Sequence, residues 1–178
     1  MLRKIIVSAL ALALVGAANL RVVYRVSAGG EEVGVYGRAE LRECVAFARD
    51  AAKELGGGEP EYSARARVTL APECGDADAL REALLENTPG VEEVYAVSVG
   101  GSRLGLCSEP SALGEVLEAR LASGACTEAT AVWFENEPTL RRIFAPEGLE
   151  CDLMELSRAL RENTRVVSST SGGAVRYG

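Results

Sequence analysis

A self-similarity inside the chain constrains its fold more than any other feature. The stretch YRVSAGGEEVGVYG begins at Tyr24, and YAVSVGGSRLGLCS begins at Tyr95, 71 positions later. Farther on, LREALLENT at 80–88 is echoed by LSRALRENT at 156–164, 76 positions later. Two separated matches, in the same order and at nearly the same period, indicate a duplicated structural unit.

The repeat divides the chain into four parts. These are a leader at 1–18, a first unit at 19–90, a second unit at 91–166 and a tail at 167–178. The tail is short and rich in Ser and Gly, so we expect it to be flexible. Its letters RVV…SGG…YG loosely echo residues 21–37, but this likeness is too weak to predict a third unit.

Each unit shows the same order of predicted elements. A β-rich hairpin turns at a glycine pair, Gly29-Gly30 in the first unit and Gly100-Gly101 in the second, because glycine supplies the positive φ of a tight turn. Apolar residues at helical spacing then predict a helix, and a third strand and a short closing helix follow. The helices are expected at 39–55 and 111–121, the third strands at 66–72 and 130–136, and the closing helices at 76–85 and 152–161. The predicted fold class is therefore α+β, with two tandem ββαβα units whose antiparallel hairpins pack on helices.

Composition excludes several classes of function. The chain has no His, and its net charge is −7. Serine and cysteine hydrolases usually need an imidazole base, and most catalytic zinc sites use His ligands. An acidic chain without a basic run is also a poor candidate for nucleic-acid binding. We therefore expect no catalytic residue, no metal, no cofactor and no nucleic-acid partner.

The first residues have the layout of a secretory signal peptide. Arg3 and Lys4 precede an apolar stretch from Ile5 to Val15, and the small residues Gly16-Ala17-Ala18 follow. We expect cleavage after Ala18 and export to the cell envelope or the medium. The alternative is an uncleaved N-terminal anchor, which would be the only part of the chain in a membrane.

Five cysteines leave at least one thiol unpaired in an exported chain. No C-x-x-C motif is present, and Cys44 falls on the apolar stripe of the first helix, as a small core residue would. Cys126 and Cys151 flank the expected third strand of the second unit and the loop after it. If one disulfide forms, we expect this pair, although sequence alone does not fix the connectivity.

One pair of carboxylates could support hydrolysis. Glu135 and Glu137 would share a face if they lie on one strand, and two carboxylates at the right separation can cleave a glycosidic bond. Solvated surface charge is the commoner role of such residues.

The stretch VYRVSAGGEEVGVYGRAELRE at 23–43 resembles the V-Y-x-V-x-x-(D/G)-G-x-x-(V/I)-G-x-V opening of duplicated ββα units. Such units are found in the N-terminal, non-catalytic regions of lysostaphin-type murein endopeptidases, exported cell-wall proteins of Gram-positive bacteria. There a LysM module or the zinc peptidase domain often follows. The likeness covers most of residues 20–165. The peptidase's His and Asp zinc ligands have no counterpart here, so no catalytic residue carries over.

The resemblance implies an exported, non-enzymatic binding module whose partner is peptidoglycan or an envelope protein. An exposed hairpin edge could accept a partner strand. One alternative is a pro-region or inhibitor of a wall peptidase. Another is a peptidoglycan hydrolase that uses Glu135 and Glu137 alone.

Overall fold

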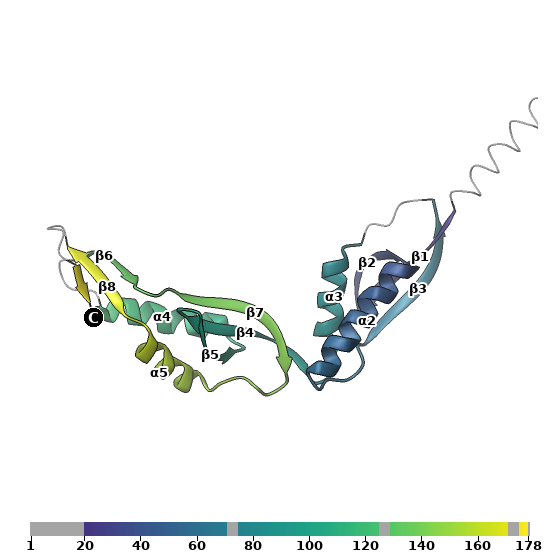
Figure 1. The fold of residues 1–178 in the computed structure, drawn as a ribbon. Helices are drawn as coiled ribbons and strands as arrows, with labels where there is room; N and C mark the ends of the chain where they lie inside the picture. The colour runs from purple at the N-terminus through teal and green to yellow at the C-terminus, as the bar shows by residue number, and fades with distance from the viewer. Residues whose placement is uncertain (1–19, 71–74, 125–128, 171–174, 178) are drawn as a thin grey trace, which may run out of the picture. The chain divides into compact units, whose positions relative to one another are not determined.

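A computed structural model describes residues 20–70, 75–124, 129–170 and 175–177 (Figure 1). The expected leader at 1–18 lies outside the described residues. The chain forms two compact units, Met1–Val91 and Glu92–Gly178. Helices and small antiparallel sheets make up both units, which confirms the predicted α+β class.

The first unit contains one three-stranded sheet and two helices. Its elements are β1 (Arg21–Ala28), β2 (Glu31–Gly37), α2 (Arg38–Glu54), β3 (Tyr62–Thr69) and α3 (Ala77–Glu86), and the strand order is β2-β1-β3. β1 pairs antiparallel with both neighbours. The apolar stripe of α2 is buried from Leu41 to Ala52, as its spacing predicted. β3 forms an edge of the sheet and is exposed along nearly its whole length.

The glycine pairs lie at the two hairpin turns. Gly29 and Gly30 have φ of 59° and 87°, and Gly100 and Gly101 have φ of 57° and 84°. Residues other than glycine rarely adopt these φ values, so both turns depend on the glycines.

The second unit departs from the simple repeat. Its elements are β4 (Val91–Val99), β5 (Ser102–Cys107), α4 (Pro110–Gly124), β6 (Ala129–Phe134), β7 (Pro138–Pro146), α5 (Leu153–Asn163), β8 (Val166–Thr170) and β9 (Val175–Tyr177). Residues 130–136, predicted as the third strand of this unit, include most of β6, which pairs with β8. The strand beside the β4–β5 hairpin is β7. The structure thus has two strands, β6 and β7, where the pattern predicted one, and a bend between Phe134 and Pro138 separates them.

The expected flexible tail at 167–178 also differs from the structure. Residues 166–170 form β8, which pairs with β6 and with β9. Val166 and Val167 are buried, with exposed fractions of 0% and 3%, and so is Ser168. The Ser-rich composition was misleading because the small Ser168 side chain fits a buried position as readily as it suits a linker.

Both closing helices begin at an aspartate cap. The carboxylate of Asp76 accepts a hydrogen bond from the backbone N–H of Asp78 at 2.9 Å, and that of Asp152 accepts one from Met154 at 3.0 Å. A buried threonine, Thr88 or Thr164, follows each helix within two residues, and its hydroxyl donates to the carbonyl four residues earlier at 2.7 Å. The sequence match at 80–88 and 156–164 therefore corresponds to a helix with the same closing hydrogen bond.

Candidate functional site: an arginine face on the first unit

The carboxylates considered for hydrolysis do not lie on a strand. Glu135 and Glu137 are exposed residues of the bend between β6 and β7. The backbone N–H of Glu135 donates to the carbonyl of Arg165 at 2.9 Å, and its carboxylate lies 4.0 Å from Nη1 of the same residue. The shared strand face that would have aligned the two carboxylates is absent from this bend.

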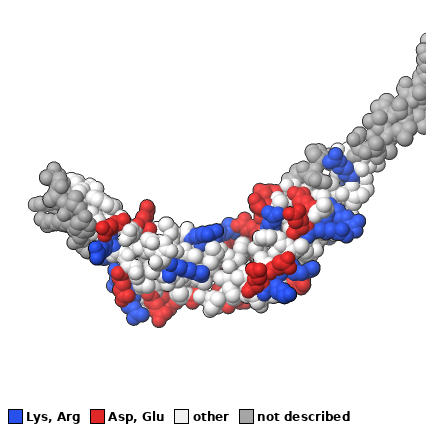
Figure 2. All heavy atoms as spheres, viewed as in Figure 1, with Lys and Arg blue, Asp and Glu red and all other residues white. Residues whose placement is uncertain are grey.

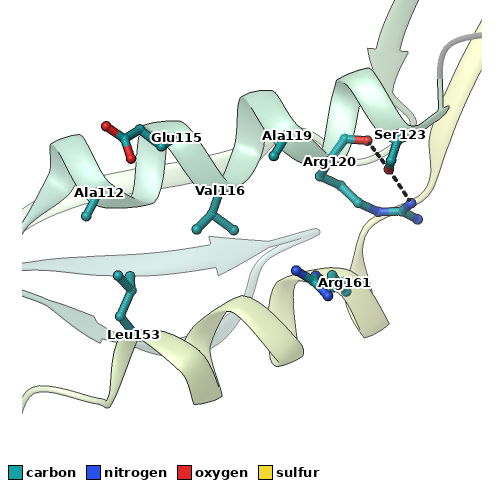
Figure 3. A pocket seen from close by; sticks show the side chains of 8 residues that line it. All are labelled: Ala112, Glu115, Val116, Ala119, Arg120, Ser123, Leu153 and Arg161. Carbon is teal, nitrogen blue, oxygen red and sulfur yellow. Dashed lines mark hydrogen bonds between the residues drawn. The ribbon is translucent and has the colours of Figure 1, made fainter.

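A hollow between α4 and α5 has a volume of about 590 Å³ (Figure 3). Val116 and Leu153 line its apolar part, and Arg120 and Arg161 approach it from the two helices. Arg120 donates to the carbonyl of Thr164 and to the hydroxyl of Ser123, both at 3.4 Å. These bonds assign Arg120 a role in holding the end of α5, and Glu115 is the only acid in the lining.

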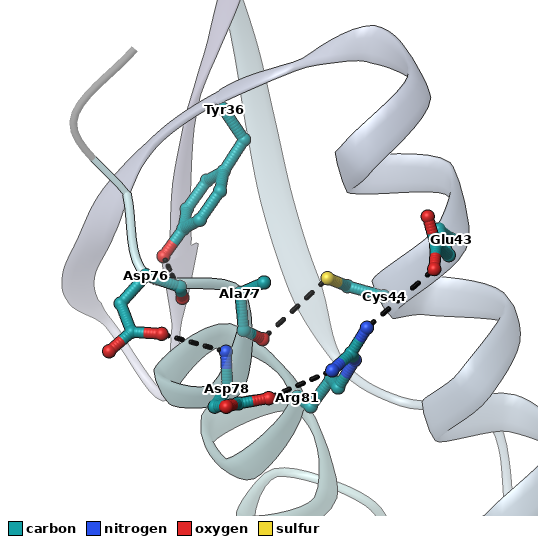
Figure 4. A network of polar contacts seen from close by, with 7 residues as sticks. All are labelled: Tyr36, Glu43, Cys44, Asp76, Ala77, Asp78 and Arg81. Carbon is teal, nitrogen blue, oxygen red and sulfur yellow. Dashed lines mark hydrogen bonds and ion pairs between the residues drawn. The ribbon is translucent and has the colours of Figure 1, made fainter.

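A polar network in the first unit joins α3 to its neighbours (Figure 4). The Tyr36 hydroxyl donates to the carbonyl of Asp76 at 3.1 Å, and the Cys44 thiol donates to that of Ala77 at 3.6 Å. Arg81 pairs with Asp78 at 2.8 Å and with Glu43 at 3.7 Å. Burial raises the pKa of both the Tyr36 hydroxyl and the Cys44 thiol. Cys44 is therefore a core residue with little thiolate character, as its place on the helical stripe predicted.

The strand register of the first sheet gathers four arginines on one face. Arg25 lies directly opposite Arg65, Arg67 lies opposite Val23, and Arg21 lies opposite Thr69. Paired residues share a face and alternate residues share a face, so Arg21, Arg25, Arg65 and Arg67 project together. All four are exposed, and we call them the arginine face. Figure 2 shows blue side chains gathered where β1 and β3 lie in Figure 1.

Few acids neutralise this face. Arg25 lies 3.4 Å from Glu32, and both side chains are about half exposed. Arg21, Arg65 and Arg67 make no ion pair with any carboxylate in the described part of the chain. Like charges directly opposite each other destabilise a sheet, so the Arg25–Arg65 pair is a local cost.

The corresponding sheet of the second unit carries acids on its central strand β4. The offset of 71 puts Glu92 where the first unit has Arg21. Glu92 accepts a hydrogen bond from the backbone N–H of Gly148 at 3.0 Å. The neighbouring Glu93 forms a two-point ion pair with Arg142, at 2.6 and 2.7 Å. The positive charge at position 21 is thus a feature of the first unit and is not shared by the repeat.

Sequence analysis missed this surface because the four arginines form no run. Arg21 and Arg25 are separated from Arg65 and Arg67 by about forty residues of sequence. Only the pairing of β1 with β3 brings the two pairs together. The available signal was alternation, since Arg65 and Arg67 sit at strand spacing in the stretch SARARV.

The other predicted features lie elsewhere or are outside the described residues. Cys126, the expected partner of Cys151, is not among the described residues, whereas Cys151 is a partly buried free thiol. Within the described residues, no cluster of acids and cysteines is placed to hold a metal ion, and no helix is long and apolar enough to cross a membrane. Comparison with protein-family models, curated proteins and solved structures finds no match to this chain.

Proposed function

We propose that this protein is an exported, non-catalytic binding module of the cell envelope and that its arginine face contacts peptidoglycan. The observation that carries the proposal is the concentration of four exposed arginines on one sheet face of an acidic chain. Guanidinium groups form strong two-point hydrogen bonds with carboxylates, and the peptides of peptidoglycan carry free carboxylates. The resemblance to the non-catalytic regions of wall endopeptidases supports the same partner.

The spacing of the face fits a polymer with repeated anionic groups. Alternate residues of a strand are about 7 Å apart, and directly opposed residues of neighbouring strands are about 5 Å apart. A single small anion would engage only one or two of the four arginines. A polymer that crosses β1 and β3 could engage all of them, so its affinity should fall steeply as salt is added.

The test is co-sedimentation of the purified protein with insoluble peptidoglycan at low and raised salt. The test variant is Arg65→Ser with Arg67→Ser, and the matched control is Arg103→Ser with Arg141→Ser, two exposed arginines of the second unit. At about 1 kcal/mol per arginine near an anionic surface, the test variant should bind roughly 10- to 30-fold more weakly. Equal binding by wild type and test variant, or an equal loss in the control, would refute the proposal.

Two further comparisons separate the competing functions. Peptidoglycan stripped of phosphate polymers should bind as well as untreated wall, and loss of binding on stripping would identify a phosphate polymer as the ligand. Wall lysis that disappears in Glu135→Gln and Glu137→Gln variants would support the hydrolase alternative. Failure to sediment, together with tight binding to a wall peptidase, would support the inhibitor alternative, in which β3 offers an open edge for a partner strand.

A binding role can also be distinguished from protection of an exposed edge. Charged residues on an edge strand discourage aggregation, and either sign of charge does this. Arg65→Glu would keep a charge on β3 and place it opposite Arg25, which should stabilise the sheet by up to about 1 kcal/mol. We expect this variant to be more stable and to bind wall more weakly, whereas unchanged binding would leave edge protection as the role of Arg65.

A further inference from the structure

Two cysteines of the second unit occupy places that a tyrosine and a glycine occupy in the first. The offset of 71 relates Tyr36 to Cys107, and the offset of 76 relates Gly75 to Cys151. The backbones agree as well. The N–H of Gly75 donates to the carbonyl of Val35 at 3.0 Å, and the N–H of Cys151 donates to that of Leu106 at 2.9 Å.

In the first unit these two places face each other. A Cβ added to Gly75 would overlap the Tyr36 ring, lying 2.5 Å from Cδ1 and closer still to Cε1 and Cζ. Because Cδ1 is only one atom removed from the Cβ of Tyr36, the two Cβ positions lie near the roughly 3.5–4.5 Å that a disulfide requires. A side chain at position 75 would therefore point at the side chain at position 36.

In the second unit, cysteines stand at both of these places, Cys107 where the first unit has Tyr36 and Cys151 where it has Gly75. Cys151 Sγ lies 2.8 Å from the place where a Cβ on Gly105 would stand, and Gly105 precedes Cys107 by two residues on the same face of β5. Both cysteines line one hollow of about 420 Å³, and both are free thiols. Cys107 is buried, whereas Cys151 is partly exposed.

We propose that Cys107 and Cys151 form a disulfide under oxidising conditions, which fastens the loop before α5 to β5. The oxidant is a small-molecule disulfide such as oxidised glutathione. The thiolate of the more accessible Cys151 attacks one of its sulfurs, forms a mixed disulfide and releases one glutathione thiolate. The thiolate of Cys107 then attacks Cys151 Sγ and releases the second glutathione. The protein loses two electrons and two protons, and the oxidant is reduced to two thiols.

The sequence allows the pairing to be mapped directly. Cleavage after Arg and Lys puts each of the five cysteines in a different peptide, with Cys107 in 104–120, Cys126 in 121–141 and Cys151 in 143–158. The full chain is incubated with oxidised glutathione, its remaining thiols are alkylated, and the unreduced digest is analysed by mass spectrometry. We expect peptide 104–120 joined to peptide 143–158, with peptides 104–120 and 143–158 both lost from the alkylated pool.

The overturning results are equally specific. A link between 121–141 and 143–158 would show the Cys126–Cys151 pair instead. If both Cys107 and Cys151 are still alkylated after the reaction with oxidised glutathione has finished, the two cysteines do not pair. Formation of the disulfide should raise the melting temperature of the wild-type protein. Cys107→Ser and Cys151→Ser should each abolish this rise, and Cys44→Ser should leave it intact. Loss of the rise in Cys126→Ser but not in Cys107→Ser would refute the proposal, and the wild-type map stands even if a serine variant folds poorly.

Discussion

The contact between Gly75 and the Tyr36 ring gives the sharpest test of how the two units are related. Tyr36 is fully buried, and a Cβ at position 75 would overlap its ring. Gly75→Ala should therefore force the ring or the loop to move. Overpacking of this kind costs about 1–3 kcal/mol, which exceeds the roughly 0.4–1 kcal/mol that alanine gains by restricting the unfolded chain.

A second substitution identifies the ring as the cause. Tyr36→Cys introduces the residue that the second unit carries at this place, and loss of the ring should cost about 3–5 kcal/mol. In that background the added methyl of Gly75→Ala meets no ring, so we expect it to cost nothing further. The double-mutant cycle should give a coupling of about 1–3 kcal/mol between positions 36 and 75.

Urea denaturation followed by circular dichroism, with a reductant present, measures these free energies of unfolding. For a unit of this size each kcal/mol also moves the melting temperature by about 4–8 °C. Gly114→Ala is the control, because a Cβ there meets nothing within 4 Å and alanine is favoured inside a helix by about 1 kcal/mol. The reasoning fails if Gly75→Ala is as stable as wild type, or if its cost persists when the ring is gone.

Three further predictions concern the stability of the units. Asp152→Ala should cost about 1 kcal/mol in the free energy of unfolding, because the N–H of Met154 loses its acceptor, and Asp152→Asn should cost less. Thr164→Val should cost about 1–2 kcal/mol by removing a buried hydroxyl that donates to the carbonyl of Leu160, whereas an unchanged urea midpoint would show that this bond is dispensable. Because burial raises the pKa of the Tyr36 hydroxyl, the folded state keeps a proton that the unfolded state loses above about pH 10. Stability should therefore be constant below that pH and fall as the pH rises toward the folded-state pKa, and melting temperatures from pH 8 to 11.5 should fall less steeply in Tyr36→Phe.

Local features of the fold were predictable because each depends on a few neighbouring residues. The glycine pairs specify turns, the stripe from Leu41 to Ala52 specifies one helix face, and Asp76 specifies a helix start. The partner of a strand is not specified in this way. Residues 131–134 are apolar and suit a strand whichever neighbour they pair with, and their pairing with β8 is not encoded in these residues.

The arginine face was unpredictable for the same reason. A run of charged residues is visible in the sequence, but Arg25 and Arg65 become neighbours only through the register of β1 with β3. Net charge was also uninformative, because an excess of acids elsewhere conceals a local basic face. A total of −7 excludes a uniformly basic protein and leaves individual surfaces unspecified.

The paired segments show that the repeat is not a closed ββαβα unit. In each of the three sheets the first strand of a hairpin is central, its second strand lies at one edge, and a strand from outside the hairpin lies at the other. β7 pairs with the β4–β5 hairpin, which precedes it in the chain. β6, only a few residues earlier than β7, pairs with β8, which follows it. The first unit shows the beginning of the same arrangement, because Gly58, just before β3, donates its N–H to the carbonyl of Pro89, as Glu135 does to that of Arg165.

This arrangement explains where the self-similarity fails. Pro89 and Arg165 are equivalent at the offset of 76, and each accepts a backbone hydrogen bond from a residue that lies a few positions before β3 or β7. The hairpins match at an offset of 71 and the closing helices at 76, so the five extra residues fall in the stretch that divides its pairing between two hairpins. That stretch has two partners to satisfy, and in the second unit it is long enough to form two strands separated by a bend. The length and sequence of this stretch are therefore constrained by pairing with both hairpins. This explains why the stretch shows the least sequence similarity between the two units.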